Sequence, residues 1–191
     1  MYILAGANGS GKSTIASVLL PTKSIVYVNP DDIARELNPA DLTAVKIEAG
    51  KVAVKRVREL VTSGESFAIE STLSGNGYVK VIKEARETGY KVVIAYAFVD
   101  SPDMCIARIA ARVKNGGHHV PDEDVVRRYY RSKGNFMNVY AELADECMIF
   151  YNGESEPILI ADKSLGGEMR IYSDSAMKLF MEGICLKQQP R

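Results

Sequence analysis

The stretch from Gly6 to Thr14, GANGSGKST, combines glycines with a lysine and hydroxyl side chains directly after an apolar run. It fits the pattern G-x-x-x-x-G-K-[ST], with a predicted strand before it and a predicted helix after it. Glycines let backbone N–H groups face a bound phosphate, and the start of the next helix favours negative charge. The sequence therefore predicts a loop that holds a nucleoside triphosphate. The alternative is a chance glycine-rich turn, and the agreement of pattern with context argues against it.

The chemistry of phosphoryl transfer assigns roles within this loop. We expect Lys12 to reach the β- and γ-phosphates, and the hydroxyl of Ser13 to ligate Mg²⁺. The expected cofactors are therefore ATP and Mg²⁺. The pattern alone leaves open whether the protein is a kinase, a motor, a transporter ATPase or a switch. The predicted ATP-binding residues are Gly6, Ala7, Asn8, Gly9, Ser10, Gly11, Lys12, Ser13 and Thr14.

Two adjacent aspartates, Asp31 and Asp32, follow the second predicted strand. Ligands of an open parallel sheet gather at the carboxyl ends of its strands, so either aspartate could face the γ-phosphate. A kinase needs a carboxylate there, to accept the proton of the attacking hydroxyl or to hold Mg²⁺ through water. The alternative is helix capping, because Asn-Pro-Asp-Asp is also a good helix opening.

Two further acids end predicted strands. Glu70 ends the third strand in FAIESTLSG, where the small polar residues that follow, including Thr72, offer donors and acceptors without bulk. We predict a substrate-binding floor there, and the alternative is a polar strand end. Asp100 ends the apolar run KVVIAYAFV in a pattern that resembles a Walker B site for Mg²⁺. Its alternative is to cap the helix that begins at Pro102.

A basic segment, RVKNGGHHVPDEDVVRRYYRS over residues 112–132, places arginines on both sides of a Gly-Gly turn. Arginines on a closing lid can neutralise the charge on the γ-phosphate oxygens and exclude water. The alternative is a solvated basic face paired with neighbouring acids. We predict a helical lid over about residues 112–133, with Arg112, Arg128 and Arg131 as its catalytic arginines.

The lid segment also carries adjacent histidines, His118 and His119. Adjacent side chains point apart on most backbones, and no cysteine or third histidine is near, so we do not expect zinc. A role in shaping the lid loop is the better interpretation.

Short apolar runs alternate with amphipathic segments along the chain, which predicts a mostly parallel sheet with helices on both faces. We expect an α/β, three-layer P-loop NTPase fold with a five-stranded or slightly larger sheet, in one domain over residues 1–191. Residues 91–99 are the predicted central strand, and Pro21 is predicted to end the first helix. The predicted strands are 2–5, 24–28, 67–69, 91–99, 148–151 and 157–160; the predicted helices are 12–20, 31–37, 42–61, 78–88, 102–114, 122–133, 136–144 and about 174–185.

Composition limits the class of protein. A chain of 191 residues that is 47% hydrophobic suits a globular domain, and its formal net charge of zero gives no reason to expect nucleic acid or a membrane as a partner. The three cysteines, Cys105, Cys147 and Cys185, are widely separated and odd in number, as expected of reduced thiols. No segment resembles a signal peptide or a membrane span, so we expect a cytoplasmic protein.

With these motifs placed, the sequence resembles the zeta toxin family of P-loop kinases. The matching stretches run in order over roughly Met1 to Ala161, and the ordered set is far more specific than the P-loop alone. They are GANGSGKST, NPDDIA, FAIESTLSG, RVKNGGHHV, RRYYRS and ADECMIFYN.

The resemblance implies an NMP-kinase-like core with a helical lid, and an ATP-dependent kinase. Characterised zeta toxins phosphorylate the 3′-hydroxyl of the sugar in UDP-N-acetylglucosamine, so the resemblance implies that acceptor and an antitoxin protein as a partner. By position, Asp31 matches the family's general base, which leaves Asp32 as a predicted substrate contact. Glu70 and Thr72 match the substrate-contacting strand end. Arg112 and Arg128 best match the lid arginines, and Arg131 also fits.

Three functions remain open. The first is a kinase with UDP-N-acetylglucosamine as acceptor, which only the resemblance implies, and the second is a kinase for another sugar or nucleotide. The third is a regulatory ATPase that acts through a protein partner. Dependence of ATP turnover on a small-molecule acceptor would separate the kinases from the ATPase.

Overall fold

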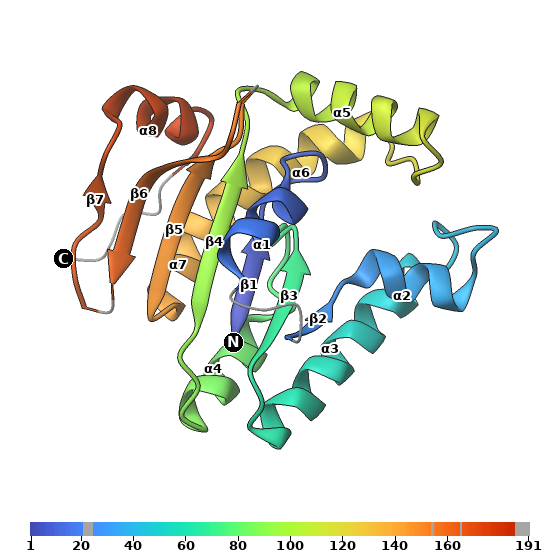
Figure 1. Ribbon diagram of the computed structural model, residues 1–191, viewed down its shortest axis with the longest axis horizontal. Helices are drawn as coiled ribbons and strands as arrows, with labels where there is room; N and C mark the ends of the chain where they lie inside the picture. Colours follow the sequence, from blue (N-terminus) through green and yellow to red (C-terminus); the bar gives the residue numbers. More distant parts are fainter. Residues whose placement is uncertain (21–24, 154, 165, 186–191) are drawn as a thin grey trace.

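A twisted β-sheet runs through the middle of the computed structural model (Figure 1). The structure describes residues 1–20, 25–153, 155–164 and 166–185. Within these ranges the sheet has seven strands in the order β2-β3-β1-β4-β5-β6-β7. The strands are β1 (Tyr2–Ala5), β2 (Val26–Val28), β3 (Phe67–Ser71), β4 (Val93–Phe98), β5 (Glu146–Tyr151), β6 (Ile158–Ser164) and β7 (Arg170–Ile171).

The first five strands of that order pair in parallel. The last two pairings, β5 with β6 and β6 with β7, are antiparallel. β4 lies in the middle of the sheet and all six of its residues are buried, as the apolar run over residues 91–99 predicted. Because β1 lies between β3 and β4, the carboxyl ends of these three strands meet at one edge of the sheet. The site is built at this edge.

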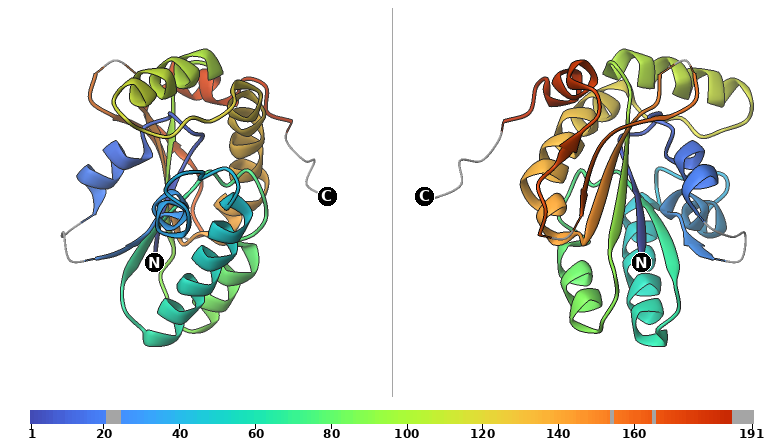
Figure 2. Two further views of the ribbon diagram at one scale, coloured as in Figure 1. Left: turned by 90° about the vertical axis from the view of Figure 1, so that its right-hand side faces the viewer. Right: turned by 60° about the vertical axis from the view of Figure 1, so that its left-hand side comes forward.

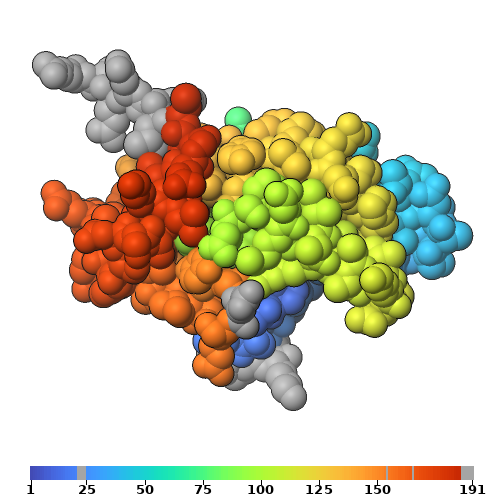
Figure 3. Space-filling view, turned by 90° about the horizontal axis from the view of Figure 1, so that it is seen from above, coloured from blue at the N-terminus to red at the C-terminus, as the bar shows by residue number. Residues whose placement is uncertain are grey.

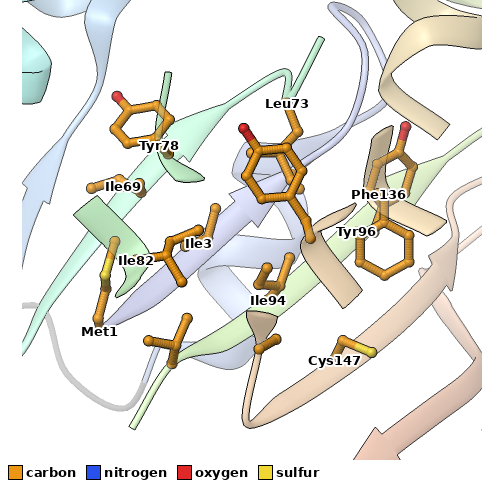
Figure 4. Packing of buried hydrophobic residues seen from close by; sticks show 14 of the residues in the cluster. Met1, Ile3, Ile69, Leu73, Tyr78, Ile82, Ile94, Tyr96, Phe136 and Cys147 are labelled. Carbon is orange, nitrogen blue, oxygen red and sulfur yellow. The ribbon is translucent and has the colours of Figure 1, made fainter. Parts of the chain in front are cut away.

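Helices cover both faces of the sheet (Figure 2). Side chains alternate along β1: Ile3 packs in the cluster with α3, α4 and α8, whereas Leu4 packs with α1 on the opposite face. Figure 4 shows the larger cluster, in which Ile3, Ile69 and Ile94 of neighbouring strands lie together under the helices. The helices are α1 (Lys12–Leu19), α2 (Pro30–Leu37), α3 (Lys46–Ser63), α4 (Val79–Glu87), α5 (Pro102–Lys114), α6 (Asp122–Asn135), the π-helix η1 (Phe136–Tyr140), α7 (Ala141–Leu143) and α8 (Asp174–Met181).

The three-layer α/β fold and the mostly parallel sheet are confirmed, with two differences in detail. Residues 136–143 are helical as predicted, but they do not form a separate helix, because α6 runs directly into η1 and α7. The short strand β7 was not predicted, because two exposed residues carry no periodic signal. Pro21, the predicted end of the first helix, lies outside the described residues, and α1 ends at Leu19.

None of the helices in the part of the chain described here is long and apolar enough to cross a membrane.

Helix α8 seals one end of the larger cluster through an aromatic group. Phe180 is fully buried, and its ring lies 5.1 Å from that of Phe98 and 5.5 Å from that of Tyr96, measured between centroids. The same helix end meets a buried cation, because Lys133 Nζ donates to the carbonyl oxygen of Glu182 at 2.9 Å. Burial lowers the pKa of Lys133 to about 8. The α8 contacts therefore belong to the core.

Phe180→Ala should lower the free energy of unfolding by about 3 to 5 kcal/mol, because it leaves a cavity among aromatic rings. Urea denaturation with a far-UV circular dichroism readout measures this change. Ile47→Ala is the matched control, since Ile47 is 77% exposed on α3 and its loss should cost less than about 0.5 kcal/mol. Equal effects of the two substitutions would contradict a core role for α8.

Candidate active site

The glycines of the P-loop are required by backbone geometry and by close packing. Gly6, Gly9 and Gly11 have φ angles of 135°, 82° and 91°, in a region that other residues rarely adopt. A Cβ at Gly6 would lie 2.2 Å from the carbonyl oxygen of Ala97, and one at Gly11 would lie 1.7 Å from Nδ2 of Asn152. The predicted loop is therefore formed between the end of β1 and the start of α1.

Two residues to which the motif analysis gave no role support this loop: Asn152 of the β5–β6 turn bonds the loop directly, and Arg108 bonds the turn. Asn152 Nδ2 donates to the carbonyl oxygen of Ser10 at 2.9 Å, and Asn152 is itself buried. Arg108 on α5 donates to the carbonyl oxygen of Gly153 at 2.5 Å, which ties α5 to the same turn. Asn152 ends a quoted stretch, ADECMIFYN, but nothing in its spacing from the loop showed that the two would meet.

The carboxylate of Glu70 lies inside the phosphate site. Its Oε1 is 3.5 Å from Lys12 Nζ, and its Oε2 accepts hydrogen bonds from Ser13 Oγ at 3.4 Å and from Tyr27 OH at 2.8 Å. Lys12 Nζ also donates to the carbonyl oxygen of Ala7 at 3.0 Å, so its ammonium group lies against the backbone of the loop. Burial and the charge of Glu70 raise the pKa of Tyr27, so this phenol stays a neutral donor.

The residues around Ser13 fit Mg²⁺ chemically. Ser13 and Glu70 supply a hydroxyl and a carboxylate, which are the hard oxygen ligands that Mg²⁺ prefers. Among the described residues no group of three or more His, Cys, Asp or Glu side chains is placed to hold a metal ion. Asp100 does not line the cleft at Ser13, and its carboxylate accepts a hydrogen bond from Tyr151 OH at 3.2 Å.

Two clefts meet at Lys12 and Glu70, which line both of them. The first cleft, of about 490 Å³, runs from the P-loop to α5 and the β5–β6 turn. The second, of about 360 Å³, lies between the P-loop, α2, α6 and the loop after β3. The polar side chains of the second cleft are Asn8, Asn29, Asp31, Lys46, Ser71, Thr72, Ser74, Arg127, Arg128 and Arg131, together with the shared pair.

The predicted lid arginines divide between the two clefts. Arg112 lines the first cleft, and its buried Nε has no hydrogen-bond partner within the described part of the chain. Arg128 and Arg131 line the second cleft. Arg128 donates to Asn8 Oδ1 of the P-loop at 3.0 Å and to Asp124 Oδ2 at 3.0 Å. The structure therefore brings two of the three arginines together in the second cleft and places Arg112 in the first.

The structure separates the two aspartates. Asp31 lines the second cleft, whereas Asp32 pairs with Arg35 on the same helix and is 55% exposed. The N-cap of α2 is Asn29, whose Oδ1 accepts from the backbone N–H of Asp31 at 2.9 Å. Since Asn29 performs the capping, neither aspartate is needed as the cap, and only Asp31 faces the site.

The loop after β3 is held by hydrogen bonds from the α6–η1 helix. Asn135 Nδ2 donates to the carbonyl oxygen of Leu73 at 2.9 Å, and Tyr140 OH donates to that of Gly75 at 2.5 Å. Ser132 donates to the carbonyl oxygen of Thr72. Leu73 has a φ of 50°, an unusual value for a branched residue, and these bonds fix the loop around it. The backbone behind Thr72 is thus rigidly positioned.

The segment predicted as a lid packs against itself, because α6 contacts α5 through buried apolar side chains. Viewed from above, α5 and α6 lie between α8 and α2 (Figure 3). Val125 and Tyr129 of α6 are buried against Cys105 and Ile109 of α5. The exposed N-terminal end of α6 reaches α3 through an ion pair, in which Lys46 Nζ lies 3.1 Å from Asp124 Oδ2.

The glycine cradle, its lysine and the parallel sheet together define a P-loop nucleotide-binding protein. Residues 1–164 match the family described as Zeta toxin, so the chain belongs to the zeta toxin family. An uncharacterized protein of Haemophilus influenzae is 38% identical over 124 residues, which are 65% of this chain and 88% of that protein.

Solved structures share the fold. A chain of the AvrRxo1-ORF1:AvrRxo1-ORF2 complex has a TM-score of 0.78 and 21% identity, and the match covers 95% of this chain and 63% of that chain. This chain therefore spans less than two thirds of that relative's length. A chain of the PezAT toxin–antitoxin system of Streptococcus pneumoniae has a TM-score of 0.62 and 19% identity, with 96% and 78% of the two chains covered.

Asp124→Asn should lower the free energy of unfolding by about 1 kcal/mol at pH 7, because Asp124 holds several cations at once. Hydrogen bonds from Arg127 and Lys46 lower the pKa of Asp124 from 3.8 to about 2. A depressed carboxyl pKa gives stability that is complete above pH 3.8 and is lost as the pH falls towards 2. The difference between wild type and variant should therefore shrink over that range in urea titrations.

Glu123→Gln is the control for Asp124→Asn, since Glu123 is an exposed acid in the same first turn of α6. It removes the same interaction with the helix dipole and leaves the ion pairs in place. A stability difference for Asp124→Asn that does not vary with pH would contradict the ion-pair account.

Proposed function

We propose that the protein is an ATP-dependent kinase that transfers the γ-phosphate of ATP to a hydroxyl of a small molecule. The observation that carries the proposal is the junction of two clefts at Lys12 and Glu70. A phosphoryl donor in the first cleft and an acceptor in the second would meet there. The alignment of two reactants at one junction is the main requirement for this reaction.

The side chains at the junction receive the following roles. Lys12 binds the β- and γ-phosphates, and Arg128, beside Asn8, neutralises the charge that develops on the transferring group. Arg112 approaches the nucleotide from the first cleft. Mg²⁺, when bound with ATP at Ser13 and Glu70, supplies charge neutralisation between the phosphates. In this proposal Glu70 has the Mg²⁺-binding role that the sequence analysis predicted for Asp100.

Asp31 is the proposed base. It is the carboxylate of the second cleft that is not already engaged with Lys12, and it faces the space where the acceptor hydroxyl would lie. It would accept the hydroxyl proton as the oxygen attacks phosphorus. Asp32, turned towards Arg35, is left without a direct role in the reaction.

The charge of the second cleft favours an anionic acceptor. Lys46, Arg127 and Arg131 line it, and so do the hydroxyls of Thr72 and Ser74. Cations bind a diphosphate, and hydroxyls bind a sugar. UDP-N-acetylglucosamine carries both groups, and it is our proposed acceptor. As partners we propose an antitoxin protein, in keeping with the toxin–antitoxin complexes among the structural relatives, and as location the cytoplasm.

The test is ATP consumption by the purified protein with and without UDP-N-acetylglucosamine, followed by mass spectrometry of the sugar nucleotide. We expect turnover to rise with the acceptor and the product to be heavier by one phosphoryl group. Lys12→Ala is the control that should abolish both signals, because it removes the phosphate-binding lysine. If no sugar or nucleotide raises the rate of ATP consumption and a protein partner does, the kinase proposal is overturned in favour of a regulatory ATPase.

Asp31→Asn should lower the rate of transfer by about a hundredfold or more, with ATP affinity unchanged, because the amide cannot accept the proton. Asp32→Asn is the matched control and should retain a rate close to that of wild type. Steady-state kinetics with a fluorescent nucleotide titration separate rate from affinity. A larger loss for Asp32→Asn would move the base to that residue.

A further inference from the structure

The loop between α5 and α6 folds back onto the end of α5. Gly116 has a φ of 83°, and a Cβ at Gly117 would lie 2.5 Å from Cγ of Arg112. Arg112 NH2 then donates to the carbonyl oxygen of His118 at 3.0 Å. The Gly-Gly turn is thus needed to bring the loop against Arg112, and this fixes the position of His118.

His118 is turned from this loop towards α2. Its Nε2 lies 3.3 Å from Oδ2 of Asp31, and its side chain is only 15% exposed. The other ring nitrogen, Nδ1, is buried and has no hydrogen-bond partner among the described residues. The imidazole is therefore held at one nitrogen by the carboxylate that lines the second cleft.

The surroundings favour one tautomer of the ring. A carboxylate oxygen only accepts hydrogen bonds, so the 3.3 Å contact with Asp31 favours the tautomer with the proton on Nε2. In the opposite tautomer Nε2 would accept from Arg112 NH2 at 3.4 Å, but its lone pair would face the Asp31 oxygen. With the proton on Nε2, Arg112 keeps its better bond to the carbonyl oxygen of His118.

These surroundings favour the neutral form of the ring. Burial lowers the pKa of His118, the charge of Asp31 raises it, and the cations Arg112, Arg35 and Lys46 lower it further. These groups come from α5, α2 and α3, which are the elements around the ring. A neutral donor can orient a carboxylate without transferring a proton to it. The carboxylate therefore keeps its charge, as a catalytic base must.

We propose that His118 is the positioning residue of the catalytic base: its Nε2–H holds Oδ2 of Asp31, so that the second carboxylate oxygen is aimed at the acceptor hydroxyl. This inference rests on the proposed kinase function. It also gives the Gly-Gly turn a purpose, because the turn carries the orienting group from α5 across to α2. His118 touches neither reactant and acts through Asp31.

Kinetics of variants test the proposal in the full chain. His118→Ala should lower kcat about tenfold to a hundredfold and leave the KM for ATP unchanged, since it removes one hydrogen bond to a charged group. His118→Gln should restore most of the rate, because its amide N–H can donate from a similar position. His119→Ala is the control: His119 is adjacent but exposed, and its loss should leave kcat as in wild type.

A raised KM for ATP with unchanged kcat, or no rescue by His118→Gln, would overturn the positioning role. The same holds if His119→Ala is as damaging as His118→Ala, because the loop and not the ring would then be responsible.

A second measurement does not depend on activity, so it separates this inference from the proposed function. The chain has two histidines, and ¹⁵N NMR of their rings reports the tautomer of each, with His119→Ala providing the assignment. We expect the Nε2–H form for His118 in wild type, and loss of that preference in Asp31→Ala, which removes the acceptor. A ring that carries its proton on Nδ1, or whose tautomer is unchanged in Asp31→Ala, would overturn the contact even if the kinase assay succeeds. If the kinase assay fails, the NMR result still decides the contact.

Discussion

The parallel pairing of β1 with β3 is the constraint on which the site depends. In this register Leu4 lies opposite Glu70, so the end of β3 reaches the loop that leaves β1. The carboxylate of Glu70 thereby arrives beside Lys12 and Ser13 without a separate loop to carry it. A shift of one residue would turn Glu70 to the other face of the sheet and remove the charge that balances Lys12.

Balance of charge explains the rest of the arrangement. Five basic side chains line the second cleft, and they would repel one another if no acid were interleaved. Glu70 faces Lys12 at the junction, and Asp124 holds Lys46 and Arg128 at the rim. An anionic ligand would replace part of these contacts, so the cleft is stable when empty and still attractive to phosphate.

The sequence predicted the fold and the phosphate loop because both depend on local patterns. The apolar run over residues 91–99 is recognisable without knowledge of its neighbours, and so is the spacing of Gly6, Gly11 and Lys12. Contacts between distant segments were not predictable in this way. Asn152 reaches Ser10 across 142 positions, and Asn135 reaches Leu73 across 62, with no sequence signal for either pairing. The roles of Asp31 and Asp32 likewise depend on which side of α2 each carboxylate leaves, and the NPDD motif did not fix that.

The π-helix η1 has a consequence for how this region can vary. Asn135 and Tyr140 both reach the loop after β3, and they are five positions apart, which is the spacing of the i→i+5 hydrogen bonds that define a π-helix. In an α-helix the same two side chains would diverge around the axis, since it repeats near every fourth residue. The π-helix therefore changes the angular position of the residues that follow it within one continuous helix. Deletion of one residue between Phe136 and Val139 would restore ordinary winding and leave Asn135 and Tyr140 four positions apart, still on one face of the helix. The same number of residues wound as a regular α-helix would turn Tyr140 away from Gly75, so the winding is constrained here more tightly than the length.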